Sequence, residues 1–490
     1  MKGVLIILCW MSWVTLFAQD YVISRPQKIS SKITEFEFIG KTDEGLLVHK
    51  FGPRVNMIEA FDLEDLSLKW YRDLELRGKR TRIVEIVEHK NELVLVYWYQ
   101  EKRVVRLFAQ KLNSQLKVVK NEVLLDEFKR GLGDPNFEYS LEHDKTRKYF
   151  VIQKKIKDTL GDDSAACIFM NENLKKIGTK VFPIEENERY IESFIQEDGS
   201  YCFVKGKVKR SFFSDGDLFN TVSIIKYNPT ANTTQETKLS HDTYLFNGFR
   251  SEWDTLNDRL VIGGFYSERQ ESEVNGYFYI FVDFAKEEPT IKKIFTPFSK
   301  EILKKMAKKG LFGGTQEHDY LQYVEIRKLI LRSDGGAILI GESHSKVSPN
   351  NDLRPSVFDS RLGSRGQVMV QYFYDDVLLI SIDPNGEMDW GEILKKQQYS
   401  ENDRGYFSSI GFVNTRASIH LLFNETLSKN AALNDFRIDK DGDYRIRNIF
   451  NANEFKLNLA PRYAQQLSAT EVIMPAFNQR NEFLLVKFVY

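Results

Sequence analysis

The chain has 490 residues, and its 69 Lys and Arg residues balance its 69 Asp and Glu residues, so its formal net charge is zero. This balance argues against a general binder of nucleic acid or anionic membranes, which needs an excess of positive charge. Phe and Tyr are abundant, with 36 and 22 residues, whereas Pro is sparse with 12, a composition that suits many aromatic-rich strands.

The N-terminus has the features of an export signal. Lys2 supplies a positive charge, residues 4–17 form an apolar run, and the small residue Ala18 precedes Gln19. The run is shorter than the ~18 apolar residues of a membrane-spanning helix. We therefore predict a signal peptide over 1–18. The mature protein is then exported, periplasmic or associated with the outer membrane, and without a transmembrane segment. A buried first strand is the alternative for this run.

From residue 34 onward, one pattern recurs: an extended strand, a short polar turn and a strongly apolar strand. The turns are rich in Asp, Asn and Gly, which favour tight hairpins. The eight copies cover 34–51, 82–99, 137–153, 190–206, 249–265, 324–342, 406–423 and 463–478. A second hairpin follows most copies, most clearly at 57–70, 378–390 and 434–446. Two hairpins per repeat predict a four-stranded antiparallel blade.

These repeats predict an all-β fold, a β-propeller of eight four-stranded blades, with seven blades or a β-sandwich as alternatives. The last repeat ends at 483–490 and lacks a fourth strand, whereas 21–27 has no partner of its own. We expect the N-terminal strand to supply the missing strand and close the ring, because closure removes exposed sheet edges. The domain assignment is a single propeller over 19–490, with insertions at about 209–220, 297–321 and 346–370.

The insertions all belong to two kinds of connection that lie on the same side of an up-and-down blade. They are a predicted short helix at 299–310 and long polar segments at 210–220, 346–366 and 395–405. The opposite side has only tight turns. Long loops on a rigid scaffold are where binding residues concentrate, although tolerated surface insertions are the alternative.

Basic and aromatic residues gather near the sixth repeat, a composition typical of interface anchors. We predict that this face contacts an envelope protein or a glycan that carries acidic or carbohydrate groups. A solvated loop is the alternative. The predicted binding residues are Arg354, Arg361, Arg365, Tyr372, Phe373, Tyr374, Lys395 and Lys396, with Lys304, Lys305, Lys308 and Lys309 in the preceding helix.

Glutamates recur at the start of the first strand of several repeats, and the first strand of a propeller blade lines the central channel. A ring of carboxylates at one mouth could hold a hydrated cation or attract a basic ligand. The alternative is solvation of a water-filled channel. The residues are Glu35, Glu37, Glu85, Glu138, Glu192 and Glu325.

Other candidate chemistry has simpler explanations. Asp439, Asp441 and Asp443 superficially suggest a calcium loop, but Gly442 comes too early in the motif, so a turn is the preferred interpretation. Cys167 and Cys202 are either bridged or buried as free thiols. No cofactor is predicted, and whether a metal binds is left open.

Two hairpins carry a resemblance to known repeats. FDLEDLSLKW ends at Trp70 and SIDPNGEMDW ends at Trp390, each with an Asp (Asp62 or Asp383) near its start. This resembles the aspartate-to-tryptophan hairpin of quinoprotein-type (PQQ-like) propellers. The resemblance implies that the Trp packs between blades. The segment 375–409 also resembles exported β-propeller-like proteins of the Bacteroidota.

The sequence therefore favours a non-enzymatic binding or scaffold propeller of the bacterial cell envelope, which uses the side with the long loops. The alternative is a propeller enzyme with its site at the channel mouth, either a quinoprotein oxidoreductase or a glycan-cleaving hydrolase or lyase.

Overall fold

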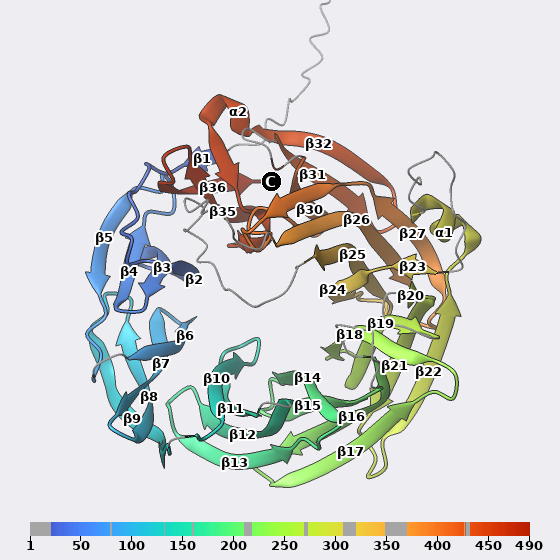
Figure 1. Ribbon diagram of the computed structural model, residues 1–490, viewed down its shortest axis with the longest axis horizontal. Helices are drawn as coiled ribbons and strands as arrows, with labels where there is room; N and C mark the ends of the chain where they lie inside the picture. The colour runs from blue at the N-terminus through green and yellow to red at the C-terminus, as the bar shows by residue number, and fades with distance from the viewer. Residues whose placement is uncertain are drawn as a thin grey trace, which may run out of the picture.

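The computed structural model describes residues 21–78, 81–131, 133–158, 161–209, 218–268, 273–306, 320–347, 370–425, 427 and 432–490. These residues form antiparallel sheets arranged in a ring around a central axis (Figure 1). The α-helices among them are α1 (Lys300–Met306) and α2 (Ala452–Phe455), and neither has the length that a bilayer crossing requires. The predicted all-β propeller fold is confirmed.

The strands form four-stranded groups, which we number as blades 1 to 8 in chain order, each running from the channel to the rim. Blade 1 contains β2 (Glu35–Thr42), β3 (Gly45–Gly52), β4 (Val55–Phe61) and β5 (Leu68–Asp73), and blade 2 contains β6 (Arg82–His89), β7 (Glu92–Glu101), β8 (Val104–Asn113) and β9 (Val118–Lys129). Blade 3 contains β10 (Asn136–His143), β11 (Tyr149–Asp158), β12 (Gly161–Asn171) and β13 (Lys176–Pro183), and blade 4 contains β14 (Glu188–Ile195), β15 (Tyr201–Val208), β16 (Phe219–Asn228) and β17 (Thr233–Ser240).

Blades 5 to 8 follow the same plan with added short strands. Blade 5 contains β18 (Leu245–Asp254), β19 (Arg259–Ser267), β21 (Gly276–Asp283) and β22 (Thr290–Pro297), and blade 6 contains β24 (Val324–Leu331), β25 (Ala337–Val347), β26 (Gln371–Ile382) and β27 (Met388–Leu394). Blade 7 contains β29 (Gly411–Asn414), β30 (Ser418–Asn424), β31 (Ala432–Asp439) and β32 (Tyr444–Asn451), and blade 8 contains β33 (Leu457–Leu459), β34 (Gln465–Gln466), β35 (Glu471–Asn478) and β36 (Phe483–Val489). The added strands are β20 (Glu273–Val274), β23 (Leu321–Gln322) and β28 (Gln398–Glu401), and a 3-10 helix at Pro461–Tyr463 separates β33 from β34.

The N-terminal strand β1 (Tyr21–Ile23) pairs antiparallel with β36, the last strand of the chain. Beyond this strand, the backbone N–H of Ser24 donates to the carbonyl of Leu485 at 2.9 Å. β1 thereby takes the outer position of blade 8, where ring closure requires it. The pairings match the eight-blade interpretation; the blade count and closure of the ring stay predictions.

The core lies between neighbouring blades, because the second and third strands of each blade are buried on both faces. β7 is therefore an almost continuous apolar run, as expected for a strand without a solvent face, whereas β3 is equally buried but includes His49 and Lys50. Between blades 2 and 3, for example, Val96 and Leu107 pack in one cluster with Leu141 and Phe150. The rim strands, such as β5, are largely exposed.

The two ends of the ring differ in their connections. We call one end the turn side, where the first strand of a blade turns into the second and the third into the fourth. The other end is the loop side, which holds α1, α2, β20, β23 and β28 and the long connections between Val208 and Phe219, Pro297 and Val324, Val347 and Gln371, and Leu394 and Gly411. The predicted helix at 299–310 is α1, whose residue Ile302 is buried; residues 307–310 lie outside the described part.

Candidate functional site

Blade 6 extends beyond the blade body on the loop side. β26 pairs with β27 only from Val377 onward, and its first residues pair instead with β28 and with the end of β25. Phe373 lies between Ser345 on one neighbouring strand and Tyr399 on the other. We call this three-stranded projection, residues 343–347, 371–374 and 398–401, the blade 6 extension.

One face of the blade 6 extension carries exposed aromatic and apolar side chains. The ring centroids of Phe373 and Tyr399 are 5.1 Å apart. Tyr399 is 40% exposed and Val347 is 51% exposed. The Gln371 amide donates a hydrogen bond to the Tyr399 hydroxyl at 3.1 Å, so the tyrosine is held in place rather than free to rotate. A fixed, half-exposed aromatic pair is typical of the anchor residues of interfaces.

A buried ionic cluster lies at the base of the blade 6 extension. The carboxylate of Glu342, in β25, contacts the Lys396 ammonium at 2.7 Å and the Arg327 guanidinium at 2.7 Å. The side chains of Glu342 and Lys396 are 0% and 1% exposed. Ser409 donates a third contact to Glu342 at 2.6 Å. Burial alone would raise the pKa of Glu342, but the charges of Lys396 and Arg327 outweigh it, so the pKa lies below its ordinary value.

The same cluster encloses the Tyr374 ring. His344 packs on the ring with centroids 4.4 Å apart, and Arg462 of blade 8 donates to the Tyr374 hydroxyl at 3.1 Å. Gly405 approaches so closely that a Cβ there would lie 2.4 Å from the ring. Lys396 also donates to the Tyr374 carbonyl at 2.9 Å. These contacts fix the extension to blades 6 and 8.

The structure therefore divides the predicted binding residues. Tyr372 and Phe373 lie in the extension, and Lys395 is exposed and paired with Asp376 at 2.7 Å. Lys396 does not emerge on the surface as predicted, and Tyr374 is buried, because both belong to the ionic cluster at the base. In α1, Lys305 pairs with Glu301 at 3.1 Å. Arg354, Arg361, Arg365, Lys308 and Lys309 lie outside the described residues.

The predicted channel glutamates lie on innermost strands, which face the centre of the ring (Figure 1). Exposed positions are held by Glu35, Glu37, Glu138 and Glu325. Glu85 and Glu192 are more enclosed, and burial raises the pKa of each to about 7. The neighbouring charges of Glu37 and Glu142 add to the rise at Glu85. Among the described residues, no group of three or more His, Cys, Asp or Glu side chains lies close enough together to coordinate a metal ion.

Two of the channel carboxylates bond to hydroxyl groups of the next blade. Ser251 in blade 5 donates to Glu192 in blade 4 at 2.6 Å, and Ser193 in blade 4 donates to Glu142 in blade 3. Glu142, Ser193 and Ser251 were not among the residues predicted from the sequence. Aligning the first strands of successive repeats and searching for hydroxyl residues next to the glutamates would have found them. These bonds give Glu142 and Glu192 a role in joining neighbouring blades.

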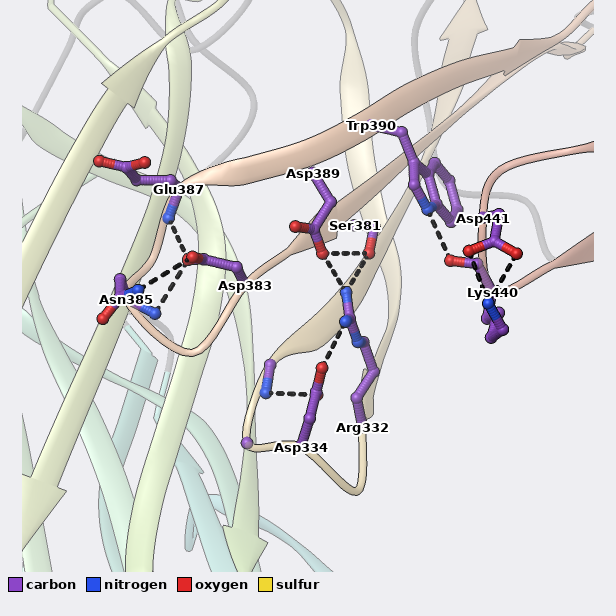
Figure 2. Close-up of polar contacts among 12 residues, drawn as sticks. Arg332, Asp334, Ser381, Asp383, Asn385, Glu387, Asp389, Trp390, Lys440 and Asp441 are labelled. Carbon is purple, nitrogen blue, oxygen red and sulfur yellow. Dashed lines mark hydrogen bonds and ion pairs between the residues drawn. The ribbon is translucent and has the colours of Figure 1, made fainter.

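Figure 2 shows the Asp-to-Trp hairpin of blade 6. Asp383 Oδ1 accepts hydrogen bonds from the backbone of Asn385 at 2.9 Å and Glu387 at 2.8 Å, which closes the turn. The indole of Trp390 donates to the carbonyl of Lys440 in blade 7 at 3.0 Å. The Trp thus lies between blades, the position that the PQQ-like resemblance implies; membership of that family stays a prediction.

Asp439 closes the corresponding turn of blade 7. Its Oδ1 accepts hydrogen bonds from the backbone of Asp441 at 3.0 Å and Asp443 at 3.1 Å, the same arrangement as at Asp383. The turn interpretation of this motif is confirmed, because the carboxylate is occupied by backbone donors. Cys167 and Cys202 are both buried and free, so the structure contains no bridge between them.

No protein-family model matches the chain, and no curated protein matches it. Solved structures that resemble it include the Dos1 propeller, with 8% identity, coverage of 93% of this chain and 95% of that chain, and a TM-score of 0.41. The Nup133 β-propeller domain of Vanderwaltozyma polyspora has 8% identity, 84% and 100% coverage, and a TM-score of 0.38. An oligogalacturonate lyase from Vibrio parahaemolyticus has 7% identity, 96% and 97% coverage, and a TM-score of 0.38. These similarities concern the fold and carry no argument about activity.

Proposed function

We propose that this protein is a binding propeller of the bacterial cell envelope, which recognises an envelope protein or a glycan through the blade 6 extension. The observation that carries the proposal is the combination of a half-exposed aromatic pair, Phe373 and Tyr399, with a rigid buried base. A projection held in one conformation loses little entropy on binding, which favours specific recognition.

The ionic cluster at the base supports a role in orienting the extension. A buried ion pair often contributes no net stability compared with apolar residues, so its presence calls for another advantage. Here Glu342, Lys396 and Arg327 come from three different segments of the chain, and their charges pair in one arrangement. This arrangement fixes the orientation of β25 and β28 and hence of the aromatic pair.

Export is part of the proposal and rests on the N-terminal sequence, Lys2 followed by the apolar run 4–17. Expression of the full chain in a Gram-negative host, followed by mass determination of the mature protein, tests it. We expect a mature chain that begins at Gln19 in the periplasmic or outer-membrane fraction. A full-length chain in the cytoplasm would contradict this part.

Photo-crosslinking in the native host tests the binding surface. A photoreactive phenylalanine analogue replaces Tyr399 in the extension or, as the control, Leu256 on the turn side, which is 74% exposed. We expect a discrete crosslinked species from position 399 and none of the same mass from position 256. Equal crosslinking from both positions, or none from position 399, would contradict recognition through the extension.

The second candidate is an enzyme whose site lies among the channel carboxylates. The observation that favours it is the raised pKa of Glu85 and Glu192, since a carboxyl group with a pKa near 7 can act as a general acid. Incubation with a panel of acidic and neutral glycans tests it. Cleavage by the wild type that Glu85→Gln or Glu192→Gln abolishes would favour the enzyme; cleavage of none of them favours the binding role.

A further inference from the structure

A pocket of about 260 Å³ lies toward the turn side of the channel, away from the blade 6 extension. Its walls come from several blades: Lys145 from blade 3, Glu252 from blade 5, Lys328 to Leu331 on β24, Phe412 to Asn414 on β29, and Gln466 from blade 8. None of these residues was predicted from the sequence to have a role. Because distant repeats converge here, the pocket exists only in the assembled ring.

The floor of the pocket is apolar and fixed. Its accessible apolar side chains are Ile330, Leu331 and Phe412, which are partly exposed. Beneath them, Leu329, Val413 and Ile419 are buried in clusters of the inter-blade core. On the far wall, the Gln466 side chain accepts from the Asn414 N–H at 3.0 Å and donates to the Asn414 carbonyl at 2.8 Å. These amide groups satisfy each other. The charged groups at the rim are therefore the ones available to a ligand.

The rim of the pocket carries an excess of positive charge. The Lys145 ammonium lies 3.7 Å from the Glu252 carboxylate, so these two charges largely cancel. Lys328 forms no ion pair within the described residues, and its ammonium lies 5.1 Å from the centroid of the Phe412 ring. An exposed ammonium held over an aromatic ring beside an apolar floor can pair with an anion without first breaking an existing ion pair.

We propose that this pocket binds a small organic carboxylate with a flat, apolar body. The body covers Ile330, Leu331 and the Phe412 ring, and the carboxylate pairs with Lys328. The volume is slightly below the ~300 Å³ at which drug-sized ligand sites begin, so the ligand is a compact one with a single ring. The proposal concerns the opposite side of the ring from the blade 6 extension and stands or falls independently of it.

The test uses 4-(trifluoromethyl)benzoate and its uncharged analogue 4-(trifluoromethyl)benzamide as ¹⁹F NMR probes of the whole mature protein. We expect the carboxylate to bind at least about fivefold more tightly than the amide, because only the carboxylate can pair with Lys328. Lys328→Met should remove this preference by weakening carboxylate binding alone.

The matched control is Lys180→Met. Lys180 is half-buried and, like Lys328, lies 5.1 Å from an aromatic ring centroid, that of Tyr227, but it belongs to the outer strand of blade 3. We expect this variant to bind both probes as the wild type does. Equal binding of the two probes by the wild type, equal effects of Lys328→Met and Lys180→Met, or no carboxylate binding up to about 5 mM would overturn the proposal.

Discussion

Replacing Lys396 by Met tests the ionic cluster at the base of the blade 6 extension. The Lys396 ammonium contacts Glu342 at 2.7 Å, the Tyr374 carbonyl at 2.9 Å and the Gln398 side chain at 3.2 Å, and all of these acceptors are buried. Removing one partner of a buried ion pair costs about 3–5 kcal/mol, because the other charge stays buried. Glu342 keeps Arg327 and Ser409, so we expect a loss near the lower value, about 3 kcal/mol. Met fills most of the vacated volume, which keeps the cavity contribution small.

The control is the same substitution at the adjacent lysine, Lys395→Met. Lys395 is 57% exposed and pairs with Asp376, and exposed pairs contribute about 0–1 kcal/mol. The assay is urea-induced unfolding followed by tryptophan fluorescence, with both variants compared with the wild type. If the two variants differ by less than about 1 kcal/mol in their free energies of unfolding, the cluster is not the stabilising base that we describe.

Three further predictions concern the channel, the ring and the hairpin turns. The pKa of Glu192 is about 7 in the fold and 4.5 in the unfolded chain, so the fold loses stability as the pH rises from about 5 to 8. Glu192→Gln should therefore be more stable than the wild type at pH 8 and equally stable at pH 5. Equal urea midpoints of the two proteins at both pH values would refute this. A chain that begins at Pro26 lacks β1, so its free energy of unfolding should be about 3–5 kcal/mol lower than that of a chain that begins at Gln19. Its melting temperature should accordingly be several degrees lower. Equal melting temperatures would argue against closure by β1. Gly442 and Gly133 have similar positive φ angles of 87° and 91°, but a Cβ added at Gly442 would lie 2.9 Å from the Trp390 ring, whereas one added at Gly133 would meet open space. Gly442→Ala should therefore lower the free energy of unfolding by about 1 kcal/mol or more beyond the effect of Gly133→Ala, as measured by thermal unfolding. Equal effects of the two substitutions would contradict the inter-blade contact.

The propeller could be predicted from the sequence because each repeat carries its own local signals. The alternation of apolar strands with Asp- and Gly-rich turns is read within about 20 residues, and Asp383 and Asp439 close their turns through contacts two and four residues away. The unpaired strand at 21–27 and the incomplete last repeat were enough to predict the pairing of β1 with β36.

The site was predicted only in part, because its contacts join distant segments. Lys396 was expected on the surface because it ends the predicted fourth strand of the sixth repeat. Its burial depends on Glu342, which lies 54 residues earlier in the sequence and pairs with it across the blade. Arg462 reaches Tyr374 from another blade, a contact that no local pattern encodes. The extension itself arises where β26 changes partner from β27 to β28, which a hairpin pattern does not reveal.

The central claim is that the blade 6 extension is the recognition surface. Hydrogen–deuterium exchange of the protein, alone and with the species captured by crosslinking at position 399, measures this most directly. We predict slower exchange on binding for the backbone amides of 371–374 and 398–401, with unchanged exchange in the turn-side residues 255–258 and 383–387. Slower exchange confined to the turn side, with the extension unaffected, would contradict the account.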